Sequence, residues 1–282
     1  MQATIDQQTQ RHIIERGIRI PPQPKVLMRL EQVLDDDNHS PRTVAATISQ
    51  DAGLAAMLFR VARSGLLYGS RAPDTLEQAI LKLGSQHVLN LARAVALSTS
   101  ISDANRKAYE LFWTRSREMA LLASLIAKDR VSVCNVFPDQ AYLAGIFLEC
   151  GVPVLMQRFP DYCETLILDR RLDAPSLREE DARFNVDHCS IGYLVGRHWK
   201  LPDFIAQAIL HKNEIPRDEL GAVRTVVAIL QLARHAHHDL CGSDNPNWSA
   251  LGHEVLHELG LAEDTLTEYL IELRERFYAA SA

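Results

Sequence analysis

The feature that most constrains this chain is an apolar stretch from Ala141 to Leu155, AYLAGIFLECGVPVL, which contains one charged residue, Glu149. Apolar residues on all sides of a helix indicate that the helix is buried. Gly151 can adopt the left-handed conformation that ends a helix, and Pro153 disfavours its continuation. We therefore expect a buried helix that stops at Gly151, with Glu149 in its last turn. This carboxylate needs a partner, because an unpaired buried charge is costly.

Helical signals recur along the rest of the chain. Ser40 followed by Pro41 is a start signal, and Thr75 to Gln78 has the form of a capping box. Apolar residues recur at helical spacing, and no window shows the alternation of a strand. We predict an all-α protein, a multi-helix bundle of about a dozen helices in two lobes that meet near residue 105. The expected helices include residues 1–20, 105–129, 161–170 and 218–239.

The composition excludes several classes of protein. The 282 residues are 47% hydrophobic, which is enough for a sizeable core. The formal net charge of −6 argues against a nucleic-acid partner. Five cysteines without a Cys-x-x-Cys pair favour reduced thiols over a disulfide framework. The N-terminus lacks the apolar core of a signal peptide, and no apolar run reaches the ~20 residues of a membrane span. We expect a soluble cytoplasmic protein with no membrane partner.

Six segments, taken in order, point to one family: Ile20–Pro24, Ile48–Asp51 with Leu54 and Leu58, Ala79–Gly84, His188–Gly192, Trp199–Pro202 and Ala208–His211. Together they resemble a bacterial signalling module, the HDOD domain, which is related to the HD superfamily of metal-dependent phosphohydrolases. The resemblance covers roughly residues 18 to 240. It implies an HD-domain-like helical bundle with an N-terminal lobe (1–105), an HD-like lobe (106–242) and a C-terminal extension (243–282). It also implies a sensor or adaptor role without catalysis.

The same resemblance implies where a metal would be bound and shows that the ligands are changed. The apolar stretch is similar to Ala-Gly-Leu-Leu-His-Asp-x-Gly, in which His and Asp hold the metal, but here those positions are Leu148 and Glu149. Arg115 takes the place of the first histidine ligand, Gln231 that of the closing aspartate, and Lys212 that of a second consecutive histidine. Leucine has no atom that could bind a metal ion, and the positive charges of Arg115 and Lys212 would repel one. We expect a degenerate site with no catalytic residue and no cofactor.

The cleft formed by these positions is the candidate ligand site. Because one side of it is cationic, the expected ligand is small and anionic or nucleotide-like. Arg115 either pairs with Glu149 or points to solvent while Glu149 lies at the rim, and the sequence leaves both open. The favoured function is regulation by binding this ligand or other signalling proteins, with a homodimer left open. The alternative is a metal-dependent phosphohydrolase with an altered ligand set. The cleft would comprise Arg115, Glu149, His188, His211, Lys212 and Gln231.

One motif points to different chemistry. His253 to His257 reads His-Glu-x-x-His, the pattern that places two zinc ligands and a general base on one helix face in zinc peptidases. No methionine follows Met156, so the Met-turn of the longer peptidase pattern has no counterpart. An amphipathic helix capped by Gly260 explains the same residues without a metal. A zinc peptidase at His253 and His257 is therefore the third candidate function.

Overall fold

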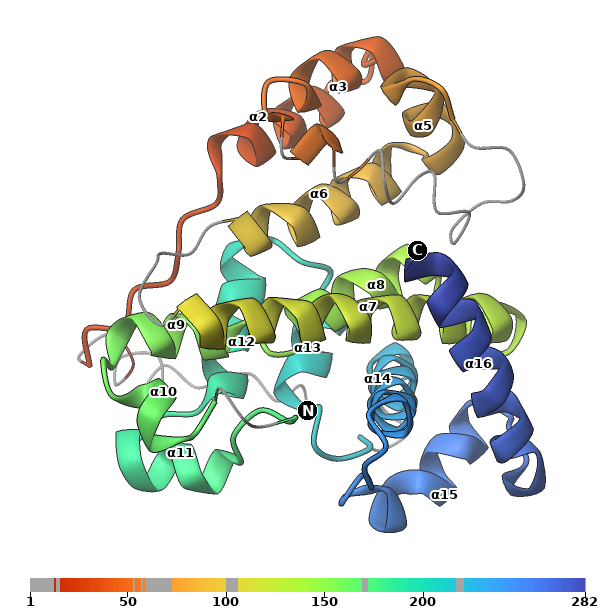
Figure 1. Cartoon of the computed structure of the whole chain (residues 1–282). Coiled ribbons are helices and arrows are strands. Elements are labelled where there is room, and N and C mark those ends of the chain that lie inside the picture. Colours follow the sequence, from red (N-terminus) through yellow and green to blue (C-terminus); the bar gives the residue numbers. More distant parts are fainter. Residues whose placement is uncertain are drawn as a thin grey trace.

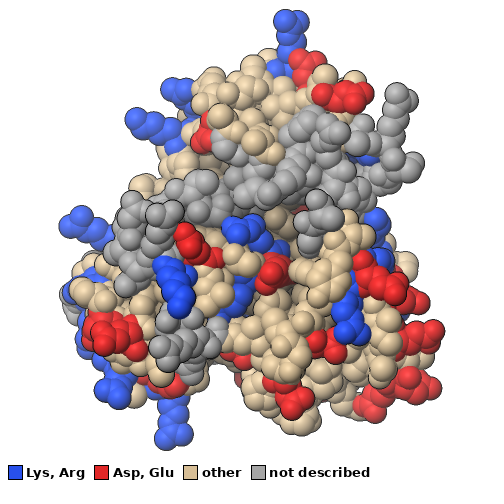
Figure 2. Space-filling view, in the orientation of Figure 1, with Lys and Arg blue, Asp and Glu red and all other residues tan. Residues whose placement is uncertain are grey.

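The computed structural model describes residues 13, 16–52, 54–56, 58, 73–99, 106–168, 172–216 and 221–281. Within these residues the chain forms fourteen α-helices and one short 3-10 helix, and no strand. The predicted all-α class is confirmed. None of the described helices combines the length and the apolar character that crossing a membrane would need. Figure 2 shows acidic and basic side chains interspersed over the visible face.

Four of the helices form the upper lobe in Figure 1. The predicted start at Ser40 is confirmed, because its side chain accepts a hydrogen bond from the backbone N–H of Thr43. Thr75 caps the next helix in the same way through Gln78, but the Gln78 side chain accepts from Asp74 and so does not complete the capping box. The four helices are α2 (Lys25–Leu34), α3 (Pro41–Ile48), α5 (Leu76–Leu83) and α6 (Ser85–Thr99).

The lower lobe surrounds the long helix α7 (Arg106–Cys134), against which α8 (Pro138–Phe147) and α14 (Gly221–Leu240) pack. Helix α6 of the upper lobe lies on α8, and the buried side chains of both lobes belong to one continuous core. The predicted boundary near residue 105 lies outside the described residues. The remaining elements are α9 (Gly151–Arg158), α10 (Tyr162–Thr165), α11 (Leu177–Phe184), α12 (His188–His198), α13 (Asp203–Leu210), α15 (Trp248–Glu258), η2 (Glu263–Thr265) and α16 (Leu266–Ser281).

The helix of the apolar stretch ends earlier than predicted. Helix α8 stops at Phe147, and α9 begins at Gly151 with Pro153 in its first turn. Proline is tolerated there because the first N–H groups of a helix have no intrahelical acceptor. Gly151 is required for a close approach and not for a left-handed cap, since a Cβ atom there would lie 2.0 Å from the carbonyl oxygen of His188. Glu149 therefore lies in the junction between two helices.

Two other predicted helices are shorter than expected. Of the helix predicted over residues 161–170, the described part, 161–168, contains only the single turn of α10, and Ile167 then takes a positive φ of 53°, which ends the helix. Most of the helix predicted over residues 1–20 lies outside the described residues. Its last part is wrong, because Gly17 has a φ of 70° and the chain from Ile18 to Ile20 is not helical.

Candidate functional site

Three side chains from separate parts of the lower lobe meet at the junction between α8 and α9. Glu149 comes from the junction, His188 from the first turn of α12, and Lys212 from the segment that follows α13. The Nζ atom of Lys212 donates to Oε2 of Glu149 and lies 2.6 Å from Nε2 of His188. The same Nε2 atom is 2.9 Å from Oε2 of Glu149. The largely buried carboxylate of Glu149 thus has two nitrogen partners, Nζ of Lys212 and Nε2 of His188.

A second carboxylate, on Glu180 of α11, orients the imidazole. Its Oε2 atom lies 2.6 Å from Nδ1 of His188 and accepts a hydrogen bond of 3.0 Å from the backbone N–H of the same residue. The hydroxyl of Tyr162 donates to the other oxygen of Glu180. The Glu180 side chain is fully buried, so these contacts hold the ring in one orientation. Sequence reasoning missed Glu180, although Phe184, one turn later and buried, marks the inward face of that helix.

Burial and close contacts shift the pKa values of two side chains in the cluster formed by Glu149, Glu180, His188 and Lys212. Burial would raise the pKa of Glu149, but Lys212 and His188 outweigh it and hold that pKa well below its ordinary value. Burial and Lys212 lower the pKa of His188, but the carboxylates of Glu149 and Glu180 help to raise it well above its ordinary value. The cluster therefore joins two acidic side chains to one lysine and one histidine through direct contacts. We call it the buried charge cluster.

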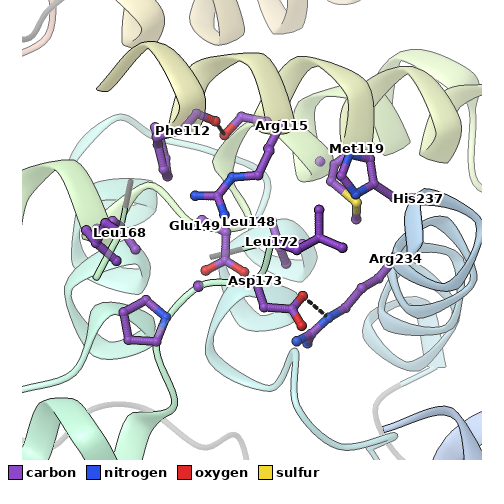
Figure 3. A pocket seen from close by; sticks show the side chains of 15 residues that line it. Phe112, Arg115, Met119, Leu148, Glu149, Leu168, Leu172, Asp173, Arg234 and His237 are labelled. Carbon is purple, nitrogen blue, oxygen red and sulfur yellow. Dashed lines mark hydrogen bonds and ion pairs between the residues drawn. The ribbon is translucent and has the colours of Figure 1, made fainter. Parts of the chain in front are cut away.

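Two further predicted residues lie against this cluster. The side-chain amide of Gln231, on α14, donates to the backbone carbonyl of Lys212 and so holds the segment that carries the lysine. Arg115, on α7, lines a small cavity together with Leu148 and Glu149. Figure 3 shows its guanidinium directed from α7 toward Glu149. Burial lowers the pKa of Arg115, although Glu149 and other nearby carboxylates oppose this effect.

His211, the remaining residue predicted for the cleft, is placed differently. Its Nδ1 atom lies 3.6 Å from Oε1 of Glu214. Its Nε2 atom is buried and has no hydrogen-bond partner among the described residues. The contacts of the described residues place it outside the buried charge cluster. The structure thus brings together Glu149, His188, Lys212 and Gln231, with Arg115 beside them. The ring of His211 instead faces Glu214.

Two cavities flank Glu149 and share one wall, the segment Leu172–Pro175. The smaller has a volume of about 50 Å³ and contains Arg115, whereas the larger has about 630 Å³ and reaches Lys212. Asp173 lies in this segment and holds it against α14, because its Oδ1 atom accepts a hydrogen bond of 2.8 Å from Nε of Arg234. Nε2 of His238 lies 3.2 Å from both oxygens of Asp173. Burial would raise the pKa of Asp173, but Arg234 and His238 hold it below its ordinary value.

The His-Glu-x-x-His motif lies on helix α15. Its two histidines, His253 and His257, are exposed, and Nη2 of Arg224 lies 3.8 Å from the carboxylate of Glu254. The apolar side of the helix is buried through Val255, Leu256 and Leu259, and Gly260 follows with a φ of 62°. The amphipathic helix with a glycine cap is therefore confirmed. Among the described residues, no group of three or more His, Cys, Asp or Glu side chains has the arrangement to hold a metal ion.

A family model, the HDOD domain, matches residues 20–215. A protein from Shewanella amazonensis SB2B, named as a putative phosphohydrolase, has a TM-score of 0.69 and 20% identity, covering 95% of this chain and 96% of its own. An HDOD domain protein of unknown function from Geobacter sulfurreducens has a TM-score of 0.64 and 21% identity, covering 96% of this chain and 95% of its own. The TM-scores show that these proteins share the fold of this chain, and at identities this low the likeness shows the fold alone.

The chain also matches an uncharacterized protein from Treponema pallidum (strain Nichols). The two are 20% identical over 208 residues, a region that covers 72% of this chain and 39% of that protein. This chain therefore spans well under half of the length of that relative.

Proposed function

Because the chain belongs to the HDOD family, we propose that it is a non-catalytic regulatory protein in which the ammonium of Lys212 replaces the metal ion of the related hydrolases. The observation that carries the proposal is the contact of Lys212 Nζ with both donor atoms of the buried charge cluster, Oε2 of Glu149 and Nε2 of His188. A divalent ion bound to those atoms would lie against a positive charge, and like charges at contact distance repel strongly where water is excluded. The residues present do not fit such an ion.

The other altered positions support the same interpretation. The amide of Gln231 is engaged by the backbone of Lys212 and carries no negative charge. Leu148 has no donor atom, and Arg115 adds a second cation next to Glu149. A site for a divalent metal normally collects several carboxylates or neutral imidazoles around one point. Here the side chains of Glu149, His188, Glu180 and Lys212 already contact one another, so the cluster is suited to stabilise the lobe and to shape the neighbouring cavity.

A protein of this kind acts through binding. The proposed partners are other signalling proteins, or a small anionic ligand in the cavities that flank Glu149. The alternative function, a metal-dependent phosphohydrolase with an altered ligand set, keeps one specific argument in its favour. Glu149 and His188 present two donor atoms only 2.9 Å apart, and they would face a metal if Lys212 withdrew.

The test measures metal content and hydrolysis in the same preparation. Protein purified without added metal is analysed for its elements and then assayed on bis(p-nitrophenyl) phosphate with and without Mn²⁺, Fe²⁺ or Mg²⁺. We expect substoichiometric metal and no turnover. Stoichiometric iron, manganese or magnesium with turnover would instead establish the phosphohydrolase. Stoichiometric zinc that disappears in His253→Ala would establish the peptidase.

A variant of the lysine sharpens this test. Lys212→Ala removes the ammonium and leaves both Glu149 and His188 in place, whereas Lys200→Ala removes a lysine whose side chain is 71% exposed. If Lys212 replaces the metal, Mn²⁺ uptake increases in Lys212→Ala and stays unchanged in Lys200→Ala. Equal Mn²⁺ uptake by the wild type and both variants would show that Lys212 does not occupy the position of a metal.

A further inference from the structure

We propose that the cavity of about 630 Å³ beside Glu149 binds a small organic molecule that carries a carboxylate or phosphate group, and that Arg234 holds this oxyanion. The inference rests on the proposed binding function and gives it a site and a chemical class of ligand. The volume lies within the range of about 300 to 1,000 Å³ that is usual for small-molecule sites. Five separate parts of the lower lobe line the cavity, namely the α8–α9 junction, residues 172–177, residues 212–213, α14 and residues 246–251.

Arg234 is arranged to bind an anion in this cavity. It lies on the long helix α14, and its Nε atom donates to Oδ1 of Asp173 at 2.8 Å. In the described part of the chain no hydrogen bond or ion pair joins its two terminal Nη nitrogens to protein. Figure 3 shows the guanidinium beside the Asp173 carboxylate with a single contact between them. A guanidinium fixed through Nε can offer its remaining N–H groups to an oxyanion with little loss of side-chain entropy.

The two carboxylates that line the cavity do not repel an anion strongly, because each is compensated. Glu149 contacts Lys212 and His188, and Asp173 contacts Arg234 and His238. Both oxygens of Asp173 and Oε2 of Glu149 are already in contact with these nitrogens. A cationic ligand would have to compete for them, whereas an oxyanion meets the Nη donors of Arg234 directly. The polarity of the wall therefore favours an anion.

The rest of the lining indicates that the ligand has an organic body. Asn213 and Asn247 bring side-chain amides to the cavity, and Leu177, Pro246 and Leu251 bring apolar surface. Amides donate and accept hydrogen bonds, and apolar walls contribute through burial of carbon. An inorganic ion would leave most of this volume and surface without contact. A mononucleotide or an organic acid has both the oxyanion and the body that the cavity matches.

Calorimetric titration of the full chain tests the proposal, without added metal, with adenosine 5′-monophosphate, succinate and inorganic phosphate as separate probes. We expect at least one organic probe to bind more tightly than inorganic phosphate, and the preferred one identifies the oxyanion as phosphate or carboxylate. Arg234→Gln should weaken that binding by at least about tenfold, the usual effect of losing a charge-assisted hydrogen bond. Arg197→Gln, an exposed arginine of α12, is the control and should leave the affinity unchanged.

Asp173→Asn separates a binding role from a structural one. Both Arg234→Gln and Asp173→Asn break the same ion pair, so a merely structural role predicts the same weakening for both variants. The binding role predicts that Asp173→Asn retains or gains affinity, because the guanidinium loses its competing carboxylate. If Arg234→Gln does not fold, Arg234→Lys replaces it, since lysine keeps the charge but lacks the fork of donors.

The results that overturn the inference differ from those that overturn the proposed function. Absence of binding by all three probes, or equal affinity in the wild type and Arg234→Gln, overturns the inference and leaves a non-catalytic protein. Release of phosphate from adenosine 5′-monophosphate in the presence of Mn²⁺ overturns the proposed function instead. Binding without release, lost in Arg234→Gln and kept in Asp173→Asn, supports both.

Discussion

Replacing Lys212 by methionine tests whether the ammonium compensates the buried carboxylate of Glu149. Methionine fills nearly the same volume as lysine but carries no charge. The side chain of Lys212 is 5% exposed and that of Glu149 is 24% exposed, so the pair is largely removed from water. Removing one partner of a buried ion pair costs about 3 to 5 kcal/mol, because the other charge stays buried without compensation. His188 remains as a partner for Glu149, so we expect the lower end, about 3 kcal/mol.

A loss of this size is measurable as a shift in the thermal midpoint. One kcal/mol corresponds to about 2 to 4 °C in chains of 150 to 250 residues, so we expect a decrease of about 6 °C or more. Lys200→Met is the matched control, because Lys200 pairs with Glu31 at 3.2 Å but is 71% exposed. The Glu31 side chain is 10% exposed but keeps Arg93 as a partner at 2.8 Å, and the contact of an exposed lysine is worth about 1 kcal/mol or less, so this variant should shift the midpoint by no more than about 4 °C.

A double-mutant cycle with Glu149→Gln isolates the pair. The amide removes the charge that Lys212 compensates, so the double variant should lose clearly less stability than the sum of the two single variants. The expected interaction free energy is about 2 kcal/mol, within the range for residues in one buried network. An interaction free energy below about 0.5 kcal/mol would refute the reasoning, since the effects of residues that act independently add to within about that value.

The pH dependence supplies a second measurement on the same variants. The pKa of Glu149 is held below its ordinary value of 4.5, so its contribution to stability is complete above that pH and is lost as the pH falls through the folded-state pKa. The gap in thermal midpoint between the wild type and Lys212→Met should therefore narrow as the pH falls below 4.5. A gap that is constant from pH 7 to pH 3 would show that the lysine acts through packing alone.

Three further predictions concern other parts of the chain. Gly151→Ala should destabilise by about 3 kcal/mol, measured by thermal unfolding, because its Cβ would meet the His188 carbonyl oxygen at 2.0 Å; an unchanged midpoint would contradict the close approach. A hydrogen bond to Asp139 raises the pKa of His87 above 6.5, so His87 stabilises fully below that pH and loses its contribution as the pH rises through the folded-state pKa. His87→Gln should therefore lose more stability at pH 6 than at pH 8, and the opposite order would refute the assignment. His253→Ala, at an exposed position, should change stability by no more than about 0.5 kcal/mol and leave metal content unchanged.

Much of the helical framework follows from signals that act within a few residues. The Ser40 cap, the Thr75 cap and the apolar periodicity predict helices that the structure contains, because caps and helix faces depend on neighbours three or four positions apart. The same local rules failed at Gly151. There they predict a helix end, whereas the glycine is required by the backbone of His188, which packs against it from another helix.

The site was predictable as a set of positions but not as a set of contacts. Resemblance identified Glu149, His188, Lys212 and Gln231, and the need of Glu149 for a partner followed from the cost of burying its charge. The sequence does not show which cation contacts Glu149, because Lys212 is 63 residues away along the chain. The tertiary structure decided between Lys212 and Arg115 as the close contact, with Arg115 pointing toward the same carboxylate from a neighbouring cavity.

The sequence by itself determined the class of fold, the family and the presence of a buried charge that must be neutralised. Only the tertiary structure revealed that Glu180 orients His188, and that Asp173 and Arg234 meet between two cavities. The physical reason is the range of the interactions. Helix formation is governed by backbone hydrogen bonds four residues apart, whereas a charge cluster depends on side chains that approach only after the helices have packed.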